Sequence, residues 1–235
     1  MLCALEHPYQ SGNIGNADNG ERLRPGGVQL TVRAIDCAGF TAGERILDLG
    51  CGNGAGVNRL RRHGCVPVGV DLAPQSLARA AQALPGLAAI AGDARRLPFA
   101  DASFDGMLAE CSLSLAGFTP ATLVECLRVL RPGGKLAVTD VFARADDAQR
   151  TALPGCLAGL ASRKDILAAL VAAGFIVERW EDHSDVLKSL LVQLILSGGG
   201  AESLWNSDGS NYTTALRACR PGYFLLIAAK LARSD

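Results

Sequence analysis

Short runs of apolar residues alternate along this chain with longer segments in which apolar residues recur every three or four positions. The short runs predict buried strands, and the amphipathic segments between them predict helices. The runs lie near residues 45–49, 66–71, 87–91, 104–109 and 135–141. Strands that alternate with helices in this way form a parallel sheet covered on both faces, so the predicted fold class is α/β and doubly wound.

The flanking segments add further elements to this core. Glycine and proline residues separate these segments, and each segment has the periodicity of one element. We expect helices near 28–38, 162–173 and 186–196, and strands near 175–180 and 223–231. The helix at 186–196 is apolar enough to pack on the core.

The pattern also indicates the domain organisation. Residues 1–24 are polar and rich in glycine and asparagine, so we expect an arm that is a candidate lid. Residues 25–235 are expected to form a single domain, a size that buries a substantial core. Irregular insertions are expected near 143–161 and 183–221, attached to the ends of strands.

The segment Ile46–Gly54 is an apolar run that leads into Gly50, Gly52 and Gly54. Such a turn lets the backbone approach a ligand closely, and the helix after it points its N-terminal amides at the same corner. The spacing G-x-G-x-G differs from the G-x-G-x-x-G of dinucleotide sites. Asp48 stands just before the turn, where its carboxylate repels a pyrophosphate and attracts an ammonium group. An ordinary strand-to-helix turn is the alternative interpretation.

Other acids stand at the predicted ends of later strands. Asp71 ends the run 66–71 and suits a ribose diol, although a helix cap is the alternative because Pro74 follows. Asp93 follows the third run, where it can bind an adenine amino group. Glu110 ends the fourth run, and the turn Arg131–Gly134 precedes the fifth.

These motifs, in this order from residue 45 to residue 142, resemble the class I S-adenosylmethionine-dependent methyltransferases of the type 11-like kind. The resemblance implies a seven-stranded, mostly parallel sheet with a final antiparallel strand, and S-adenosylmethionine as methyl donor with S-adenosylhomocysteine as product. It also implies cofactor contacts. The methionine part is cradled by Gly50, Cys51, Gly52, Asn53 and Gly54, the ribose is held by Asp71, adenine is bound by Asp93 and the Ala94 amide, and the purine faces are packed by Leu72 and Leu97.

Composition narrows the substrate class. The 235 residues include 23 Lys and Arg and 23 Asp and Glu, so the formal net charge is zero. A nucleic-acid partner usually requires a basic surplus, so a small-molecule methyl acceptor is expected instead. We find no apolar stretch of membrane-spanning length and no secretory signal, so we expect a cytoplasmic protein without membrane contact. The eight cysteines are then expected to be reduced.

Three of those cysteines, Cys111, Cys156 and Cys219, map to the expected ligand edge. Thiols around one cavity suit a soft acceptor such as arsenic or selenium, although buried cysteines are often only compact core residues. The segments 109–115, 138–143 and 155–160 resemble parts of arsenite methyltransferases, which implies that Cys156 binds a metalloid. The helix after the glycine loop lacks the second cysteine of that family. We expect no resident metal ion.

Catalytic residues are expected near the acceptor. His183 is the candidate base, because imidazole titrates near neutral pH, and a helix cap is its alternative role. Glu110 is expected to orient the methionine group or the acceptor, and Tyr9 and Arg24 of the arm are candidates to close over the site. A cofactor-binding protein without catalysis, acting through a partner, is the alternative function. A nucleotide-dependent oxidoreductase is disfavoured by Asp48 and the glycine spacing. The sequence does not indicate the oligomeric state.

Overall fold

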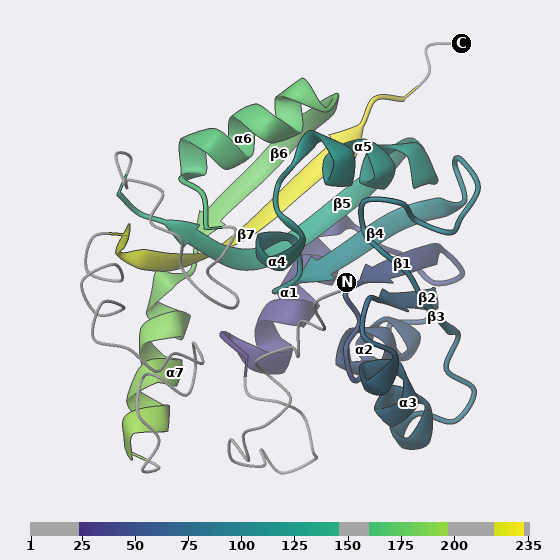
Figure 1. Ribbon diagram of the computed structural model, residues 1–235, viewed down its shortest axis with the longest axis horizontal. Helices are drawn as coiled ribbons and strands as arrows, with labels where there is room; N and C mark the ends of the chain where they lie inside the picture. The colour runs from purple at the N-terminus through teal and green to yellow at the C-terminus, as the bar shows by residue number, and fades with distance from the viewer. Residues whose placement is uncertain (1–23, 146–159, 197–218, 233–235) are drawn as a thin grey trace, which may run out of the picture.

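The computed structural model describes residues 24–145, 160–196 and 219–232, and these ranges form one α/β unit. A seven-stranded sheet runs in the order β3-β2-β1-β4-β5-β7-β6 (Figure 1). The strands are β1 (Arg45–Leu49), β2 (Val66–Asp71), β3 (Ala89–Ala91), β4 (Phe104–Glu110), β5 (Leu130–Ala143), β6 (Phe175–Asp182) and β7 (Pro221–Lys230). Only β7 is antiparallel to its neighbours. The predicted sheet, including its antiparallel last strand, is confirmed.

Several strand boundaries differ from the prediction. The third strand begins at Ala89, not at residue 87, because the Leu87 amide closes a turn onto the Leu84 carbonyl. The fifth strand begins at Leu130, which pairs with Phe104 before a register shift, so the expected turn at Arg131–Gly134 is an irregular part of the strand. Strands β6 and β7 end at Asp182 and Lys230 rather than at residues 180 and 231.

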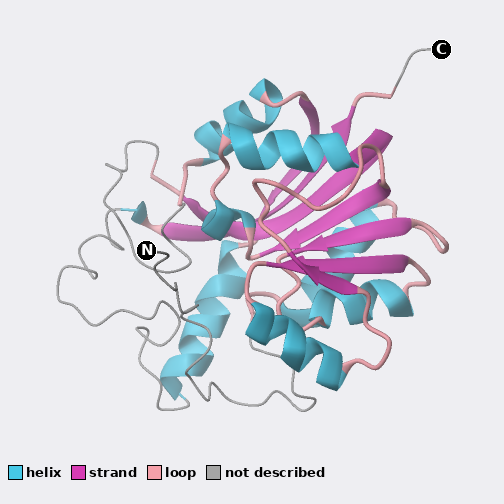
Figure 2. Ribbon diagram, turned by 45° about the vertical axis from the view of Figure 1, so that its right-hand side comes forward, coloured by secondary structure: helices cyan, strands magenta, loops and turns pink. Residues whose placement is uncertain are grey.

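Two layers of helices cover the sheet, as Figure 2 shows. The helices are α1 (Gly27–Ala38), α2 (Ala55–Arg62), α3 (Pro74–Ala83), α4 (Leu113–Ala116), α5 (Pro120–Val129), α6 (Arg163–Ala172) and α7 (Ser184–Leu196). Helices α1, α2 and α7 contribute to one buried cluster, and α4, α5 and α6 contribute to the other. Successive residues of β1 and β4 enter opposite clusters, as the two-residue period of a strand requires. Both faces of the central strands are therefore buried.

Helix α1 shows how the sequence sets this packing. Leu30, Ala34 and Ile35 recur at helical spacing and are buried against the sheet. Gly39 ends the helix in the left-handed conformation, with φ of 71°. The buried face also carries one polar residue, Thr31, which is fully buried.

Helix α7 packs on the core, as expected, through Leu187 and Leu190. It begins at Ser184, whose amide donates to Asp182 Oδ1 at 2.8 Å. Val192 and Leu196, farther along the helix, are exposed. Among the described residues, no helix is both long enough and apolar enough to cross a membrane.

Candidate functional site

The site lies where the parallel strands β1, β2, β4 and β5 end side by side. Leu49 of β1 pairs with Val70 of β2 on one side and Ala109 of β4 on the other, and Glu110 pairs with Thr139 of β5. Ligands of open α/β sheets bind beyond the carboxyl ends of the strands. The glycine loop and the predicted acids therefore meet at this edge.

The glycine loop turns through three residues in the left-handed region. Gly50, Gly52 and Gly54 have φ of 74°, 52° and 84°. The amides of Gly50 and Cys51 both donate to the Val70 carbonyl, which fixes the loop to β2. A Cβ on Gly50 would lie 2.5 Å from Ser112 Cβ, so the first glycine is required by close packing as well as by φ. The turn therefore requires glycine at its first position.

Cys51 takes part in this turn through its backbone. Its side chain is buried, and a Cβ on Gly69 would lie 2.6 Å from the Cys51 thiol. Burial raises the pKa of this thiol well above its ordinary value. The structure thus places the Cys51 thiol against β2, beneath the loop. Asn53 lies in the loop and is half-buried.

Asp48 lies beneath the start of α2. Its side chain is 3% exposed, it accepts a hydrogen bond from the Val57 amide, and its Oδ2 would lie 2.5 Å from a Cβ on Gly56. Burial, together with the charge of Glu110, raises the pKa of the Asp48 carboxyl to about 7, while Arg24 and the Val57 amide act in the opposite direction. The carboxyl therefore changes its charge near neutral pH.

Asp71 connects the end of β2 to the glycine loop. Its Oδ2 accepts from the Gly52 amide and its Oδ1 accepts from the Ala73 amide, both at 2.8 Å. Helix α3 begins after Ala73, and no side chain caps it by the standard pattern. Each carboxylate oxygen keeps a second lone pair, so Asp71 can hold the loop and still accept from a diol.

Glu110, at the end of β4, is held by two residues: one precedes α1 and the other lies within it. Thr31 Oγ1 donates to Glu110 Oε1 at 2.9 Å, and Arg24 Nη1 lies 2.9 Å from Glu110 Oε2. Arg24 Nη2 also donates to Thr31 Oγ1. Sequence reasoning noted Arg24 but missed Thr31, whose only signal was a polar residue on the apolar face of α1.

The expected adenine loop has a different internal arrangement from the one predicted. Leu97 is 3% exposed and belongs to the core, so its expected place on a purine face is wrong, whereas Leu72 is 65% exposed. Asp93 accepts from the Arg95 amide and guanidinium, which lowers the pKa of the Asp93 carboxyl, and Ala94 is half-buried against the core. Asp93, which was expected to bind adenine, is therefore paired with Arg95.

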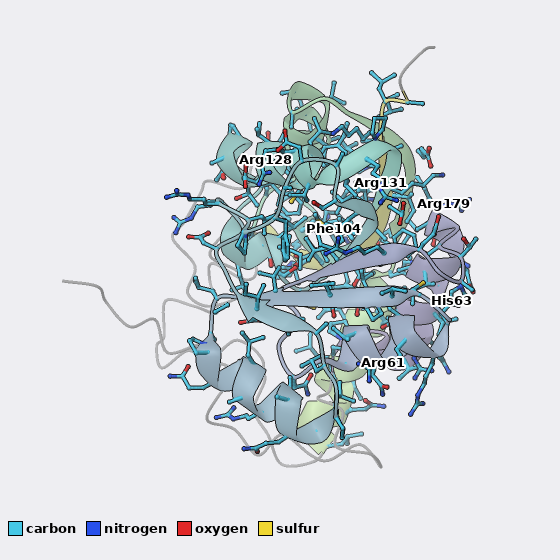
Figure 3. The ribbon with its side chains drawn as sticks, turned by 90° about the vertical axis from the view of Figure 1, so that its right-hand side faces the viewer. Arg61, His63, Phe104, Arg128, Arg131 and Arg179 are labelled. Atoms are coloured by element: carbon cyan, nitrogen blue, oxygen red, sulfur yellow. The ribbon has the colours of Figure 1, made fainter. Side chains whose placement is uncertain are left out.

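A second arginine fixes the segment that follows this loop. Arg128 of α5, labelled in Figure 3, pairs with Glu125 and donates to the carbonyls of Leu97 and Phe99. The Leu97 amide donates to Glu125 Oε2 at 2.7 Å. Helix α5 thus holds the backbone at Leu97 and Phe99 in place, after the loop that follows β3.

Two of the three predicted thiols lie in the described residues. Cys111 Sγ is 2.9 Å from Tyr223 Oη, and Cys111 has φ of 50°, an uncommon conformation for a residue with a side chain. Cys219 is 4% exposed in the cluster beneath α1 and α7. Burial raises the pKa of both thiols. Cys156 lies outside the described residues, as does Tyr9.

The described ranges offer no site for a metal ion. In them, no three His, Cys, Asp or Glu side chains are grouped so that they could hold a metal ion. Cys111 and Cys219 therefore do not belong to a larger ligand cluster of these ranges.

His183 follows β6 at the same edge of the sheet. Its Nε2 lies 2.9 Å from Glu181 Oε2, and Glu181 also pairs with Arg33 of α1 and with Arg179. Hydrogen bonds from Arg33, His183 and Arg179 lower the pKa of Glu181 to about 2. The imidazole is therefore oriented by a carboxylate. The expected helix-cap role falls instead to Asp182, which accepts from Ser184.

Buried polar atoms without hydrogen bonds mark the centre of the site. In the described residues, these atoms are Asp48 Oδ2, Glu110 Oε2, Ser112 Oγ and Ser114 Oγ. Glu110 Oε2 has Arg24 close by but accepts no well-aligned hydrogen bond. Such atoms cost free energy unless a ligand or water satisfies them. Ser112 packs on Gly50, Asp48 packs on Gly56, and Glu110 ends β4 beside β1, so the residues present suit a ligand with cationic and polar groups at this loop.

Comparison with known proteins identifies this arrangement. Residues 47–138 match the family model described as "Methyltransferase domain". The chain is 42% identical over 106 residues to a demethylmenaquinone methyltransferase of Beutenbergia cavernae, which covers 45% of this chain and 44% of that protein. It is 33% identical over 152 residues to an arsenite methyltransferase of Halobacterium salinarum, which covers 59% of this chain and 39% of that protein. The chain thus spans less than half the length of these curated relatives.

Solved structures extend the likeness beyond the matched segment. Phosphoethanolamine N-methyltransferase 2 of Haemonchus contortus, in complex with S-adenosyl-L-methionine, superposes with a TM-score of 0.69 at 21% identity, over 92% of this chain and 55% of that one. The cyclase SpnF superposes with a TM-score of 0.67 at 26% identity, over 87% and 82%. The motif order, the sheet order with its antiparallel β7 and the matched segment agree. The described residues therefore have the fold of the class I S-adenosylmethionine-dependent methyltransferases, and residues 47–138 match the methyltransferase-domain model.

Proposed function

We propose that this protein transfers a methyl group from S-adenosylmethionine to a small molecule. One arrangement carries the proposal: Asp48 Oδ2, Glu110 Oε2 and Ser112 Oγ, buried and without hydrogen bonds in the described residues, lie around a glycine loop that Asp71 holds in place. A ligand with a cationic methionine group and a ribose diol satisfies these atoms together. The names of the matched relatives support the same class of reaction.

The residues of the loop and of the strand ends bind different parts of the cofactor. The Gly50–Gly54 loop cradles the methionine part, and Asp71 accepts from the ribose while it holds the Gly52 amide. Leu72, which is exposed, covers one face of the purine, and the Ala94 amide binds its edge. Asp93 reaches adenine by exchanging its Arg95 partner. Exposed ion pairs of this kind are weak, so the exchange costs little.

The bound donor supplies an electrophilic methyl group, which an acceptor lone pair attacks in line. The chain's own residues orient the two reactants and exclude water from between them. The fully buried Asp140 accepts from the amides of Ser114 and Val141, and so fixes α4 against the end of β5. This contact holds the Cys111–Ser112 turn next to the cofactor loop.

His183 serves as the base for an acceptor that loses a proton. Strands β4 and β6 are separated by three strand spacings, which corresponds to about 14 Å. An acceptor that His183 deprotonates must therefore extend across the ends of β5 and β7. Glu181 orients the imidazole through this hydrogen bond, as a base of this kind requires.

A thiol-bound metalloid is the second acceptor class that we propose to test. Support comes from the arsenite methyltransferase relative and from the resemblance around Cys156. The demethylmenaquinone relative supports an apolar quinone-like acceptor instead. Within the described residues, the Cys111 thiol bonds to Tyr223 and the Cys219 thiol is buried, which favours the quinone-like acceptor over a thiol-bound metalloid.

The function is tested with S-adenosylmethionine that carries a labelled methyl group. The acceptors are arsenite, small thiols, a demethylated quinol and a fatty acid, with Cys156→Ser compared against wild type and Cys37→Ser as matched control. Transfer to one acceptor supports the proposal. Tight S-adenosylhomocysteine binding without any transfer supports the non-catalytic alternative. Tight NAD binding without S-adenosylhomocysteine binding contradicts the proposal. Equal arsenite methylation by Cys156→Ser and wild type excludes a metalloid role for Cys156.

Cofactor affinity is expected to rise with pH through neutrality. In the free protein, the Asp48 carboxyl has a pKa of about 7, raised by burial and by Glu110, so below that pH it is mostly neutral. A bound cation favours the ionised form, so binding releases a proton, and affinity falls by up to about tenfold per pH unit below 7. Calorimetry of S-adenosylhomocysteine binding from pH 6 to 8, in two buffers of different ionisation enthalpy, measures the released proton. Asp48→Asn is expected to remove most of the slope, and a flat wild-type profile contradicts this role for Asp48.

A further inference from the structure

Arg24 stands between the acids of the methionine corner, although it belongs to the chain before α1. Its side chain is 21% exposed, and its Nη1 lies 2.9 Å from Glu110 Oε2. Its positive charge also acts on Asp48, Cys111 and Tyr223, which places the guanidinium among the ends of β1, β4 and β7. No motif of the matched domain includes this residue, because the match begins at residue 47.

The contact between Arg24 and Glu110 is close but poorly aligned. Glu110 Oε2 accepts no hydrogen bond within the described residues, although Arg24 Nη1 is within ion-pair distance. Glu110 Oε1 is held separately by Thr31, which also accepts from Arg24 Nη2. Arg24 and Glu110 are therefore both anchored on Thr31, while Arg24 Nη1 and Glu110 Oε2, which face each other, form no aligned hydrogen bond.

A methionine group carries an ammonium and a carboxylate on the same carbon atom. Glu110 and Asp48 attract the ammonium, but they repel the carboxylate that comes with it. A site that accepts the whole group needs a fixed cation next to the acids. Among the described residues, Arg24 is the cation that lies against Glu110. Its planar guanidinium is well suited to a carboxylate, because two parallel hydrogen bonds can form.

We propose that Arg24 binds the carboxylate of the cofactor's methionine group and that Glu110 binds its ammonium, so that the cofactor enters between the two members of the ion pair. This assignment rests on the proposed function. Thr31 holds Glu110 Oε1 and Arg24 Nη2 both before and after the cofactor binds. Glu110 Oε2 and Arg24 Nη1 separate from each other, and each binds the ligand instead. One internal ion pair is thereby replaced by two pairs with the ligand, and Glu110 Oε2 gains an aligned donor.

The test uses S-adenosylhomocysteine and two analogues, one without the carboxylate and one without the amine, in competition binding to the full chain. Wild type is expected to bind both analogues about ten- to a hundredfold more weakly than S-adenosylhomocysteine, the effect of losing one charged hydrogen-bonded pair. In Arg24→Met, the penalty for the missing carboxylate is expected to fall to about onefold or twofold, while the penalty for the missing amine remains. Glu110→Gln is expected to show the reverse pattern.

Arg33→Met is the matched control, because Arg33 lies on α1, the helix that follows Arg24, but pairs with Glu181. It is expected to leave both penalties unchanged, and thermal melts of all variants confirm folding. Tighter binding of S-adenosylhomocysteine by Arg24→Met would show that Arg24 blocks the site, and this outcome overturns the assignment. An unchanged carboxylate penalty in Arg24→Met also overturns it while the proposed function stands. If no adenosyl ligand binds wild type, the proposed function fails first, and the assignment fails with it.

Discussion

Asp71→Ala is expected to weaken S-adenosylhomocysteine binding by about a hundredfold, a loss of about 3 kcal/mol. The Asp71 carboxylate has two tasks, since it accepts from the Gly52 amide and, in the proposed function, from the ribose hydroxyls. Alanine removes the ribose contacts and also leaves the Gly52 amide unpaired, so the loop loses one of its links to β2, while the bonds from Gly50 and Cys51 to Val70 remain. Isothermal titration of the purified variant measures the effect directly.

Two further variants give this prediction its controls. Asp71→Asn keeps one acceptor oxygen, so a smaller loss of about tenfold is expected. Asp36→Ala removes an exposed acid from α1 and is expected to leave affinity unchanged. An affinity of Asp71→Ala within about threefold of wild type would mean that the ribose lies elsewhere.

Gly50→Ala is expected to lower the free energy of unfolding by about 3 kcal/mol, the sum of two costs. A side chain at φ of 74° is strained, and the new Cβ would lie 2.5 Å from Ser112 Cβ. For a chain of this length, the corresponding fall in the melting temperature is about 6 to 12 °C, which calorimetry or circular dichroism measures. Cofactor binding should be lost in parallel, since the loop must shift.

A second glycine separates the two costs. Gly86 has φ of 71°, but a Cβ there meets nothing within 4 Å, so Gly86→Ala carries the backbone strain alone, about 1 kcal/mol. Adding Ser112→Gly to Gly50→Ala should recover the steric part. If Gly50→Ala and Gly86→Ala are equally stable, the packing of Gly50 on Ser112 does not matter for stability.

The sheet could be predicted because each strand is identified by a short stretch of sequence. Each strand from β1 to β4 is an apolar run that ends at or is followed by glycine or an acid, and the order of such motifs distinguishes this family from dinucleotide-binding folds. The position of Asp71 at the glycine loop follows from the same rule, since neighbouring parallel strands end at one edge.

The side-chain partners could not be predicted in the same way. Thr31 and Glu110 are separated by 79 positions, and nothing in either segment identifies the other. Leu97 was misplaced because an apolar residue after Asp93 suits a purine face and a core equally well, and only tertiary packing decides between them. Asp93 follows the end of β3, as predicted, but Arg95 forms an ion pair with it and so competes with a ligand for the carboxylate.

Helix α1 bonds to the central strand β4 and to the outer strand β6 of the sheet through residues only two positions apart. Thr31 donates to Glu110 at the end of β4, and Arg33 pairs with Glu181 at the end of β6. A local opening that detaches α1 therefore releases the methionine corner and the outer strand in the same event. The amides near Glu110 and those of β6 should then exchange their hydrogens at matched rates. A cofactor bound beside Glu110 should also slow exchange in β6.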